Sequence, residues 1–151
     1  DKVLIQFSNL LKKNCRASDL VVRWGGEEFV IISHYSNSNG ASELAERIRA
    51  STEQMKFFYN NNQWIKLTCS MGFYCFPGTS NQRHISFNQI LKIADKALYA
   101  MKSNGRNAWL GIINIKQELD KNTDLKEVFT DLKSLKSNRD FKVCSSLFKE
   151  T

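Results

Sequence analysis

Residues 20–33 read LVVRWGGEEFVIIS. This stretch holds two β-rich runs, residues 20–24 and 29–33, which are separated by two glycines and two glutamates. A glycine pair between such runs is typical of a β-hairpin, because glycine takes positive φ angles at little cost and both turn positions can use them. The stretch therefore predicts a strand, a tight turn and a second strand, with Glu27 and Glu28 at the mouth of the turn.

Three helices are predicted around this hairpin, because apolar residues recur there at the spacing of one helical face. They cover residues 3–14, 41–54 and 87–103. The third helix has the clearest ends. Ser86 and Gln89 match a capping box at its start, and Asn104 and Gly105 are residue types common where a helix stops.

More strands are predicted after the second helix. Residues 56–76 predict a second hairpin, with a turn at residues 60–62 and one return strand that starts at Trp64. Residues 108–113 form another apolar run and predict a further strand. Residues 115–151 are charged and weakly amphipathic, which predicts one or two surface helices without an assigned role.

The composition predicts a single soluble domain. The chain has 151 residues, the length of one globular domain, and its seven glycines and one proline exclude collagen-like and disordered classes. We expect no membrane-spanning helix and no secretory leader, because the chain has no long apolar run and no leader pattern. The four cysteines lack metal-binding spacing and are expected to be reduced thiols. This predicts a cytoplasmic location, on its own or as the cytoplasmic part of a membrane-anchored sensor.

The charge predicts anionic partners. The chain carries 22 Lys and Arg against 15 Asp and Glu, a net charge of +7. Such a surplus suits nucleic acid, a lipid surface or nucleotide phosphates, and charge alone does not choose among them. We expect no nucleic-acid binding, because the aromatic residues fall mainly on periodic core positions and do not alternate with an exposed basic stripe. Those positions are Phe7, Phe29, Phe73 and Phe87.

The glutamate pair is the sharpest candidate for chemistry. Adjacent carboxylates at a glycine turn repel each other unless cations or hydrogen-bond donors offset their charge, so Glu27 and Glu28 invite a metal ion. Strand alternation sends the two side chains to opposite faces, so at most one of them points at a given ligand. Gly25 and Gly26 have no side chains and let a phosphate or a base approach the backbone. Taken alone, the pattern is more typical of a solvated hairpin tip with two surface glutamates.

Two other residue pairs carry charge at suggestive positions. Lys102 and Arg106 lie one turn apart at the end of the third helix, where they can clamp a polyphosphate or simply interact with the helix dipole. Arg16 and Asp19 precede the first strand. An arginine fork and a carboxylate can read two edges of guanine, and the same pair can also form an ordinary surface salt bridge.

The order of these motifs resembles the GGDEF family of diguanylate cyclases. The resemblance covers residues 1 to about 113 and includes four ordered stretches. They are Arg16-x-x-Asp19, the signature GGEEF at residues 25–29, AERIR at residues 45–49, and ADKALYAMKSNGRN at residues 94–107. GGEEF is an accepted active form of the family signature.

The resemblance implies an α/β fold of the α+β kind. This is the palm-like, ferredoxin-like domain of nucleotidyl cyclases, with a central antiparallel-rich sheet and flanking helices. It assigns residues 1–114 to the GGDEF domain and leaves residues 115–151 as a helical extension. The family's first strand, with its other metal-binding carboxylate, and the helix that follows it precede Asp1. The domain is therefore expected to be truncated at its N-terminus, and the 151-residue piece alone is expected to be inactive.

The resemblance also implies an activity. A diguanylate cyclase condenses two GTP molecules into cyclic di-GMP and two pyrophosphates, with Mg²⁺, or Mn²⁺ in its place, as the cofactor. Two such domains meet face to face as a homodimer, under the control of an upstream sensory domain. The runner-up is a non-catalytic receptor of cyclic di-GMP.

Roles for individual residues follow from the same resemblance. Glu27 and Glu28 are the catalytic residues, and Glu27 also holds the metal. Another group binds the substrate, namely Asp1, Gly25, Gly26, Lys102 and Arg106. A third group, Arg16, Asp19 and Arg47, forms an inhibitory site for cyclic di-GMP.

The substrate prediction rests partly on Asp1. It precedes Gly25 by the same separation as the family's guanine-reading aspartate. A carboxylate accepts hydrogen bonds from guanine N1–H and N2–H but repels the N1 lone pair of adenine, which favours GTP over ATP. The whole interpretation requires that Glu27 and the Lys102–Arg106 pair meet on one triphosphate.

Overall fold

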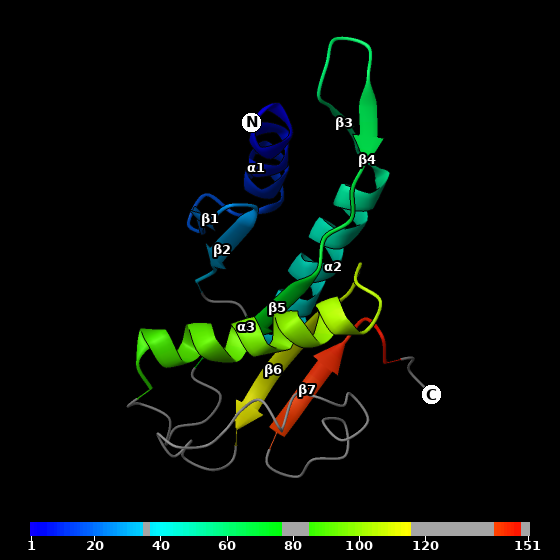
Figure 1. Ribbon diagram of the computed structural model, residues 1–151. Coiled ribbons are helices and arrows are strands. Elements are labelled where there is room, and N and C mark those ends of the chain that lie inside the picture. Colours follow the sequence, from blue (N-terminus) through cyan, green and yellow to red (C-terminus); the bar gives the residue numbers. More distant parts are fainter. Residues whose placement is uncertain (35–36, 77–84, 116–140, 149–151) are drawn as a thin grey trace. The chain divides into compact units, whose positions relative to one another are not determined.

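The structure is a computed structural model that describes residues 1–34, 37–76, 85–115 and 141–148 (Figure 1). These residues form helices α1–α3 and strands β1–β7. The chain divides into two compact units, Asp1–Cys69 and Ser70–Thr151, and each unit is described by itself. None of the described helices has the length and apolar character needed to cross a membrane.

Helix α1, Lys2–Asn14, organises the first unit. Its apolar stripe buries Leu10 and Leu11. The ring of Phe7 on the same helix packs edge-on against Phe29, with centroids 5.4 Å apart, and also contacts Phe57 at 6.3 Å. Because Phe29 and Phe57 come from different hairpins, one aromatic side chain of α1 joins both hairpins of the unit.

The predicted first hairpin is confirmed. Strand β1, Leu20–Gly25, pairs antiparallel with β2, Glu28–Ile32. The register shifts between Arg23 and Gly25, which leaves Trp24 as a bulge whose side chain is exposed. Only the second glycine of the pair, Gly26, has a positive φ angle, at 51°. The sequence predicted that both glycines would lie in the turn. In the structure Gly25 belongs to β1, so the turn contains only Gly26 and Glu27.

Helix α2, Ser38–Gln54, follows the first hairpin and packs against α1 with Ala45, Ile48 and Thr52 buried. Its N-cap is Asn37, whose side-chain oxygen accepts a hydrogen bond from the Gly40 N–H at 2.9 Å. In Figure 1 the second hairpin extends beyond the C-terminal end of α2. It consists of β3, Lys56–Phe58, and β4, Trp64–Lys66, paired antiparallel.

The prediction of one long return strand from Trp64 was wrong. The chain leaves the strand conformation after Lys66 and resumes it in β5, Met71–Tyr74. The physical reason is a change of partner. Strand β4 hydrogen-bonds to β3, whereas the Met71 N–H bonds to the Ala108 carbonyl and β5 pairs with β6.

The second unit is built on a mixed three-stranded sheet. Strand β5 runs parallel to β6, Trp109–Ile115, and the two are joined by α3, Phe87–Ser103, which packs on them. The predicted capping box of Ser86 and Gln89 is confirmed. The core between helix and sheet contains Ile93, Ala97, Met101, Leu110 and Ile112, all buried.

Strand β7, Phe141–Ser145, pairs antiparallel with the other edge of β6. The sequence predicted helix for residues 115–151, but residues 141–145 form a strand because their backbone groups complete the β6 edge. The helices expected over residues 116–140 lie outside the described residues. The described strands form three sheets, β1–β2, β3–β4 and β5–β6–β7, where the family resemblance implied one central sheet.

The cysteines are free thiols, as the sequence predicted. Cys69 lies in the break between β4 and β5, and its Sγ is 3.5 Å from the Thr52 hydroxyl oxygen. Burial raises the pKa of Cys75 to about 11, with a further contribution from Cys144.

We expect Gly72→Ala to destabilise the second unit. A Cβ at Gly72 would overlap the Ala94 carbonyl oxygen and the Leu98 nitrogen of α3. Forcing that methyl group into backbone atoms should lower the free energy of unfolding by about 1–3 kcal/mol or more, measured by urea denaturation. Gly25→Ala is the matched control, because a Cβ there meets no heavy atom within 4 Å. Equal stability of the two variants would contradict the expected helix–strand contact.

Candidate nucleotide site

Glu27 occupies the turn between β1 and β2, beside Gly26, and its side chain is exposed. Glu28 is the first residue of β2 and lies opposite Gly25. The sequence predicted that alternation along one strand would separate the two carboxylates. In the structure Glu27 lies in the turn and Glu28 is the first residue of β2. The two glutamates therefore do not belong to one strand, and alternation along a strand does not describe them.

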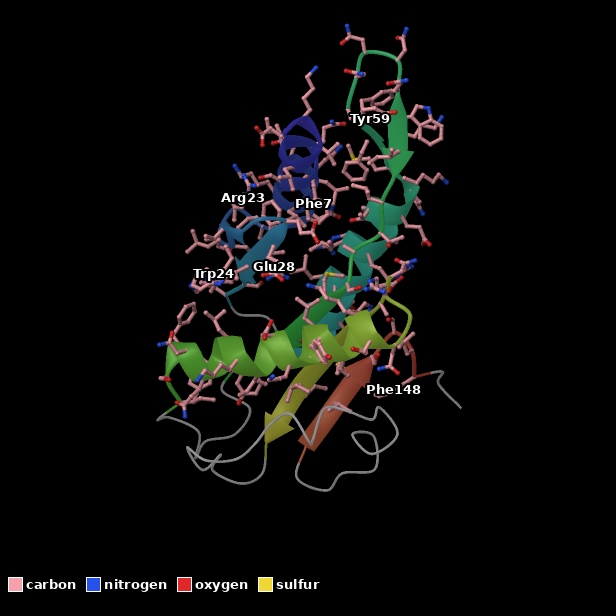
Figure 2. The ribbon with its side chains drawn as sticks, viewed as in Figure 1. Phe7, Arg23, Trp24, Glu28, Tyr59 and Phe148 are labelled. Carbon is pink, nitrogen blue, oxygen red and sulfur yellow. The ribbon has the colours of Figure 1, made fainter. Side chains whose placement is uncertain are left out.

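An arginine that the sequence analysis did not single out holds this turn. The Arg23 guanidinium donates two hydrogen bonds to the Gly26 carbonyl oxygen, from Nε at 3.0 Å and from Nη2 at 2.8 Å. Figure 2 shows Arg23, Trp24 and Glu28 on this hairpin. The fork fixes the carbonyl next to Glu27 and brings a positive charge to an acidic turn. The sequence feature that could have indicated this contact is an arginine three residues before Gly26.

Asp19 closes the loop before β1. Its Oδ2 accepts the Arg16 N–H at 2.8 Å, and its Oδ1 accepts the Ser33 hydroxyl at 3.0 Å. Burial acts to raise the pKa of Asp19. The pKa nevertheless lies below its ordinary value, because these two hydrogen bonds, a third from the His34 N–H and the charge of Arg16 all stabilise the ionised carboxylate. No ion pair joins the Arg16 guanidinium to Asp19 among the described residues. The sequence analysis left open an ordinary salt bridge between Arg16 and Asp19. In the structure the two residues are joined by a hydrogen bond from the Arg16 backbone N–H to the Asp19 carboxylate.

Arg47 comes from α2 and reaches the end of α1. Its Nη2 donates to the Asn14 carbonyl oxygen at 2.7 Å. Burial raises the pKa of the neighbouring Cys15 thiol, Asp19 raises it further, and Arg47 lowers it. The grouping of Arg16, Asp19 and Arg47 into one inhibitory site stays a prediction.

Lys102 and Arg106 flank the end of α3 in the second unit. The Arg106 N–H bonds to the Met101 carbonyl oxygen at 3.0 Å, and the three residues Gly105, Arg106 and Asn107 have φ angles of 100°, 60° and 48°. Positive φ is unfavourable for residues other than glycine, so this loop stores strain at Arg106 and Asn107. The predicted helix end at Asn104 and Gly105 is confirmed.

Asp1 is the N-cap residue of α1, and its side chain makes no capping hydrogen bond. The helix therefore does not use the carboxylate that the sequence analysis assigned to guanine. Asp1, Arg16, Asp19, Arg47 and the GGEEF turn belong to the first unit, and Lys102 and Arg106 belong to the second. The meeting of Glu27 with the Lys102–Arg106 pair stays a prediction.

The acidic turn suits a hard metal ion. The described residues contain no cluster of three or more His, Cys, Asp or Glu side chains that could cage a metal. Mg²⁺ in nucleotide sites is usually bound through one or two carboxylates, with water and phosphate oxygens as the other ligands. The exposed Glu27 carboxylate beside a glycine fits that mode of binding.

Comparisons with known proteins define the family. Residues 1–108 match the family model of the diguanylate cyclase GGDEF domain, and the chain belongs to this family. The chain is 37% identical over 107 residues to diguanylate cyclase DosC of Escherichia coli, which covers 71% of this chain and 22% of DosC. It is 36% identical over 112 residues to the response regulator PleD of Caulobacter vibrioides, covering 74% of this chain and 24% of PleD. The chain thus spans about a quarter or less of these two relatives.

Solved structures confirm the fold class. The GGDEF domain of YfiN (also TpbB) from Pseudomonas aeruginosa superposes with a TM-score of 0.61 at 26% identity, over 71% of this chain and 64% of that chain. The active GGEEF domain of a diguanylate cyclase from Vibrio cholerae gives 0.57 at 31% identity, with the same coverage. SiaD from Pseudomonas aeruginosa, solved with its activator SiaC, gives 0.61 at 27% identity over 70% of this chain and 38% of that chain.

We expect the Asp19 carboxyl to titrate below 3.8, the ordinary value, in an NMR titration of the folded chain. A lowered pKa in the folded state stabilises the fold at neutral pH, and this contribution is lost as the pH falls through that lowered pKa. Ser33→Ala should move the midpoint upward, because it removes the hydroxyl that donates to the carboxylate. Ser42→Ala is the control, since its hydroxyl bonds within α2. A midpoint at or above 3.8 in the parent chain would overturn the assignment.

Proposed function

We propose that the chain is the catalytic part of a diguanylate cyclase that condenses two GTP molecules into cyclic di-GMP and two pyrophosphates. The observation that carries this proposal is the GGEEF turn, in which Glu27 is exposed and the neighbouring carbonyl is held by Arg23. Membership of the GGDEF family supports it, and so does the structural likeness to the active GGEEF domain from Vibrio cholerae.

The reaction forms two bonds, each from the ribose 3′-oxygen of one GTP to the α-phosphorus of the other. At each bond the hydroxyl proton passes to solvent, and one pyrophosphate leaves with the electrons of the broken P–O bond. Such transfers depend mostly on positioning and on neutralising charge. When bound, Mg²⁺ neutralises the triphosphate and lowers the pKa of the attacking hydroxyl. Glu27 would hold that ion, with Mn²⁺ as a substitute, and Glu28 would support the same turn. Because each domain holds one GTP, two domains act as a homodimer.

The remaining residues position the nucleotide. The absence of side chains at Gly25 and Gly26 leaves the turn open to the nucleotide, and no heavy atom lies within 4 Å of a Cβ built at either position. Lys102 and Arg106 contact the triphosphate, whose negative charge suits two cations at the end of a helix. Asp1, whose carboxylate is not used in helix capping, accepts hydrogen bonds from the guanine N1–H and N2–H groups.

Glu27→Gln should abolish product formation in the full-length protein incubated with GTP and Mg²⁺. Loss of the metal-binding charge should reduce turnover by about a hundredfold or more, measured as cyclic di-GMP by chromatography. Glu43→Gln is the matched control, because Glu43 is an exposed carboxylate on α2 outside the site. Unchanged turnover in Glu27→Gln would refute the assigned role.

A second candidate, a non-catalytic receptor, is favoured by one observation. Asp19 is kept ionised by its hydrogen bonds, and no described residue forms an ion pair with the Arg16 guanidinium. Arg16, Asp19 and Arg47 can then bind cyclic di-GMP, either as an inhibitory site of the enzyme or as the whole function of a receptor. Cyclic di-GMP binding by the parent protein without any turnover of GTP would favour the receptor.

Arg16→Ala should relieve product inhibition. We expect the cyclic di-GMP concentration for half-inhibition to rise by about tenfold or more, because a charged hydrogen bond to guanine or phosphate is lost. Initial rates with increasing product provide the measurement. Lys13→Ala, an exposed cation on α1, should leave the inhibition unchanged. The inhibitory role of Arg16 fails if both variants are inhibited equally.

A further inference from the structure

The β3–β4 hairpin carries different side chains on its two faces. On one face Phe57 is fully buried against α1, and Ile65 lies directly opposite it on β4 and is 38% exposed. Side chains alternate along a strand, so the other face carries the pairs Lys56–Lys66 and Phe58–Trp64. We call these four residues the outer face. Phe58 and Trp64 lie directly opposite each other and are 44% and 43% exposed, so two aromatic side chains adjoin on this face.

The outer face concentrates positive charge. Lys56 and Lys66 lie directly opposite each other, and like charges at such positions destabilise a hairpin. The Lys56 ammonium is 4.5 Å from the centre of the Trp64 ring, which is a cation–π contact. Neither lysine forms an ion pair with an acidic side chain of the described residues. An anionic group placed between them would relieve the repulsion.

The two edges of the hairpin differ. On the β3 edge, the Gln6 side chain donates to the Phe58 carbonyl oxygen at 2.6 Å and accepts the Phe58 N–H at 3.0 Å. The backbone groups of Phe58 therefore point away from β4. In an antiparallel pair the opposite residue does the same, so the N–H and C=O of Trp64 point outward from β4. No described residue hydrogen-bonds to them. Gln6 thus covers the β3 edge, whereas the β4 edge has no hydrogen-bond partner among the described residues of its unit, and we call it the open edge of β4.

We propose that an extended acidic segment of a partner protein adds to the open edge of β4 as a third strand. Its carboxylates would meet Lys56 and Lys66, and an apolar side chain would pack on Trp64. A peptide suits the site better than nucleic acid or a lipid surface, because only a peptide backbone matches the alternating N–H and C=O groups of a strand edge. The same edge of a second copy is a poor partner at this site, since it carries the same two lysines.

Lysines on edge strands have another known effect, which is to discourage pairing with other chains. That purely protective role predicts that no peptide binds at β4. A binding experiment therefore separates the two explanations.

The probe is a fluorescein-labelled peptide, Glu-Thr-Glu-Val-Phe-Val-Glu, which places its acids and its phenylalanine on one face of a strand. We expect the 151-residue chain to increase its fluorescence anisotropy in a saturable and salt-sensitive manner. Lys56→Glu/Lys66→Glu should weaken binding by about tenfold or more, because two attractions become repulsions. Lys12→Glu/Lys13→Glu, with the same change of net charge on α1, should bind like the parent chain.

Two further probes test the strand geometry and guard against misfolding of the variant. The peptide with lysines in place of glutamates should bind Lys56→Glu/Lys66→Glu and not the parent chain, which also shows that the variant is folded. A peptide N-methylated at alternate residues keeps its charges but loses backbone donors, and it should bind much more weakly. The proposal is overturned by equal binding of the N-methylated peptide, by no binding of the parent peptide, or by tighter binding of oligothymidylate or phosphatidylglycerol vesicles.

Discussion

Two hydrogen bonds from Arg23 to the Gly26 carbonyl oxygen set the geometry on which the candidate site depends. A turn with one positive φ angle has few stabilising contacts of its own, and its exposed glutamates add repulsion. The guanidinium counters both effects, since it holds the backbone and supplies the opposite charge. The acidic turn can therefore stay ordered while its glycines leave the backbone accessible.

The same principle of holding a backbone through a side chain recurs in the first unit. Asp19 accepts a hydrogen bond from the Arg16 N–H, and Arg47 donates one to the Asn14 carbonyl oxygen. The Gln6 side chain hydrogen-bonds to both the N–H and the carbonyl oxygen of Phe58. Each contact satisfies a backbone group that no strand or helix satisfies. Together with the Phe7 ring, these contacts hold loops and hairpins against α1 and α2 without one continuous sheet.

The second unit is held by close packing. Gly72 lets β5 approach the backbone of α3, and the absence of a side chain at Gly111 leaves room for the Phe73 ring and the Cys144 sulfur. Strand β7 then completes the β6 edge. The family match ends at residue 108, so β6 and β7 lie beyond it and extend the sheet with residues that the motifs did not describe.

Local spacing was enough to predict the first hairpin, the three helices, the capping box at Ser86 and the helix end at Gly105, because each depends on residues a few positions apart. The order of the motifs was enough to identify the family. The sequence did not predict the Arg23 contact, the break after Lys66, the strand at residues 141–145 or the open edge of β4. Those features depend on which distant groups meet, as Gln6 meets Phe58 across 52 positions. Hydrogen-bond partners so far apart in the chain are chosen only when the whole unit folds.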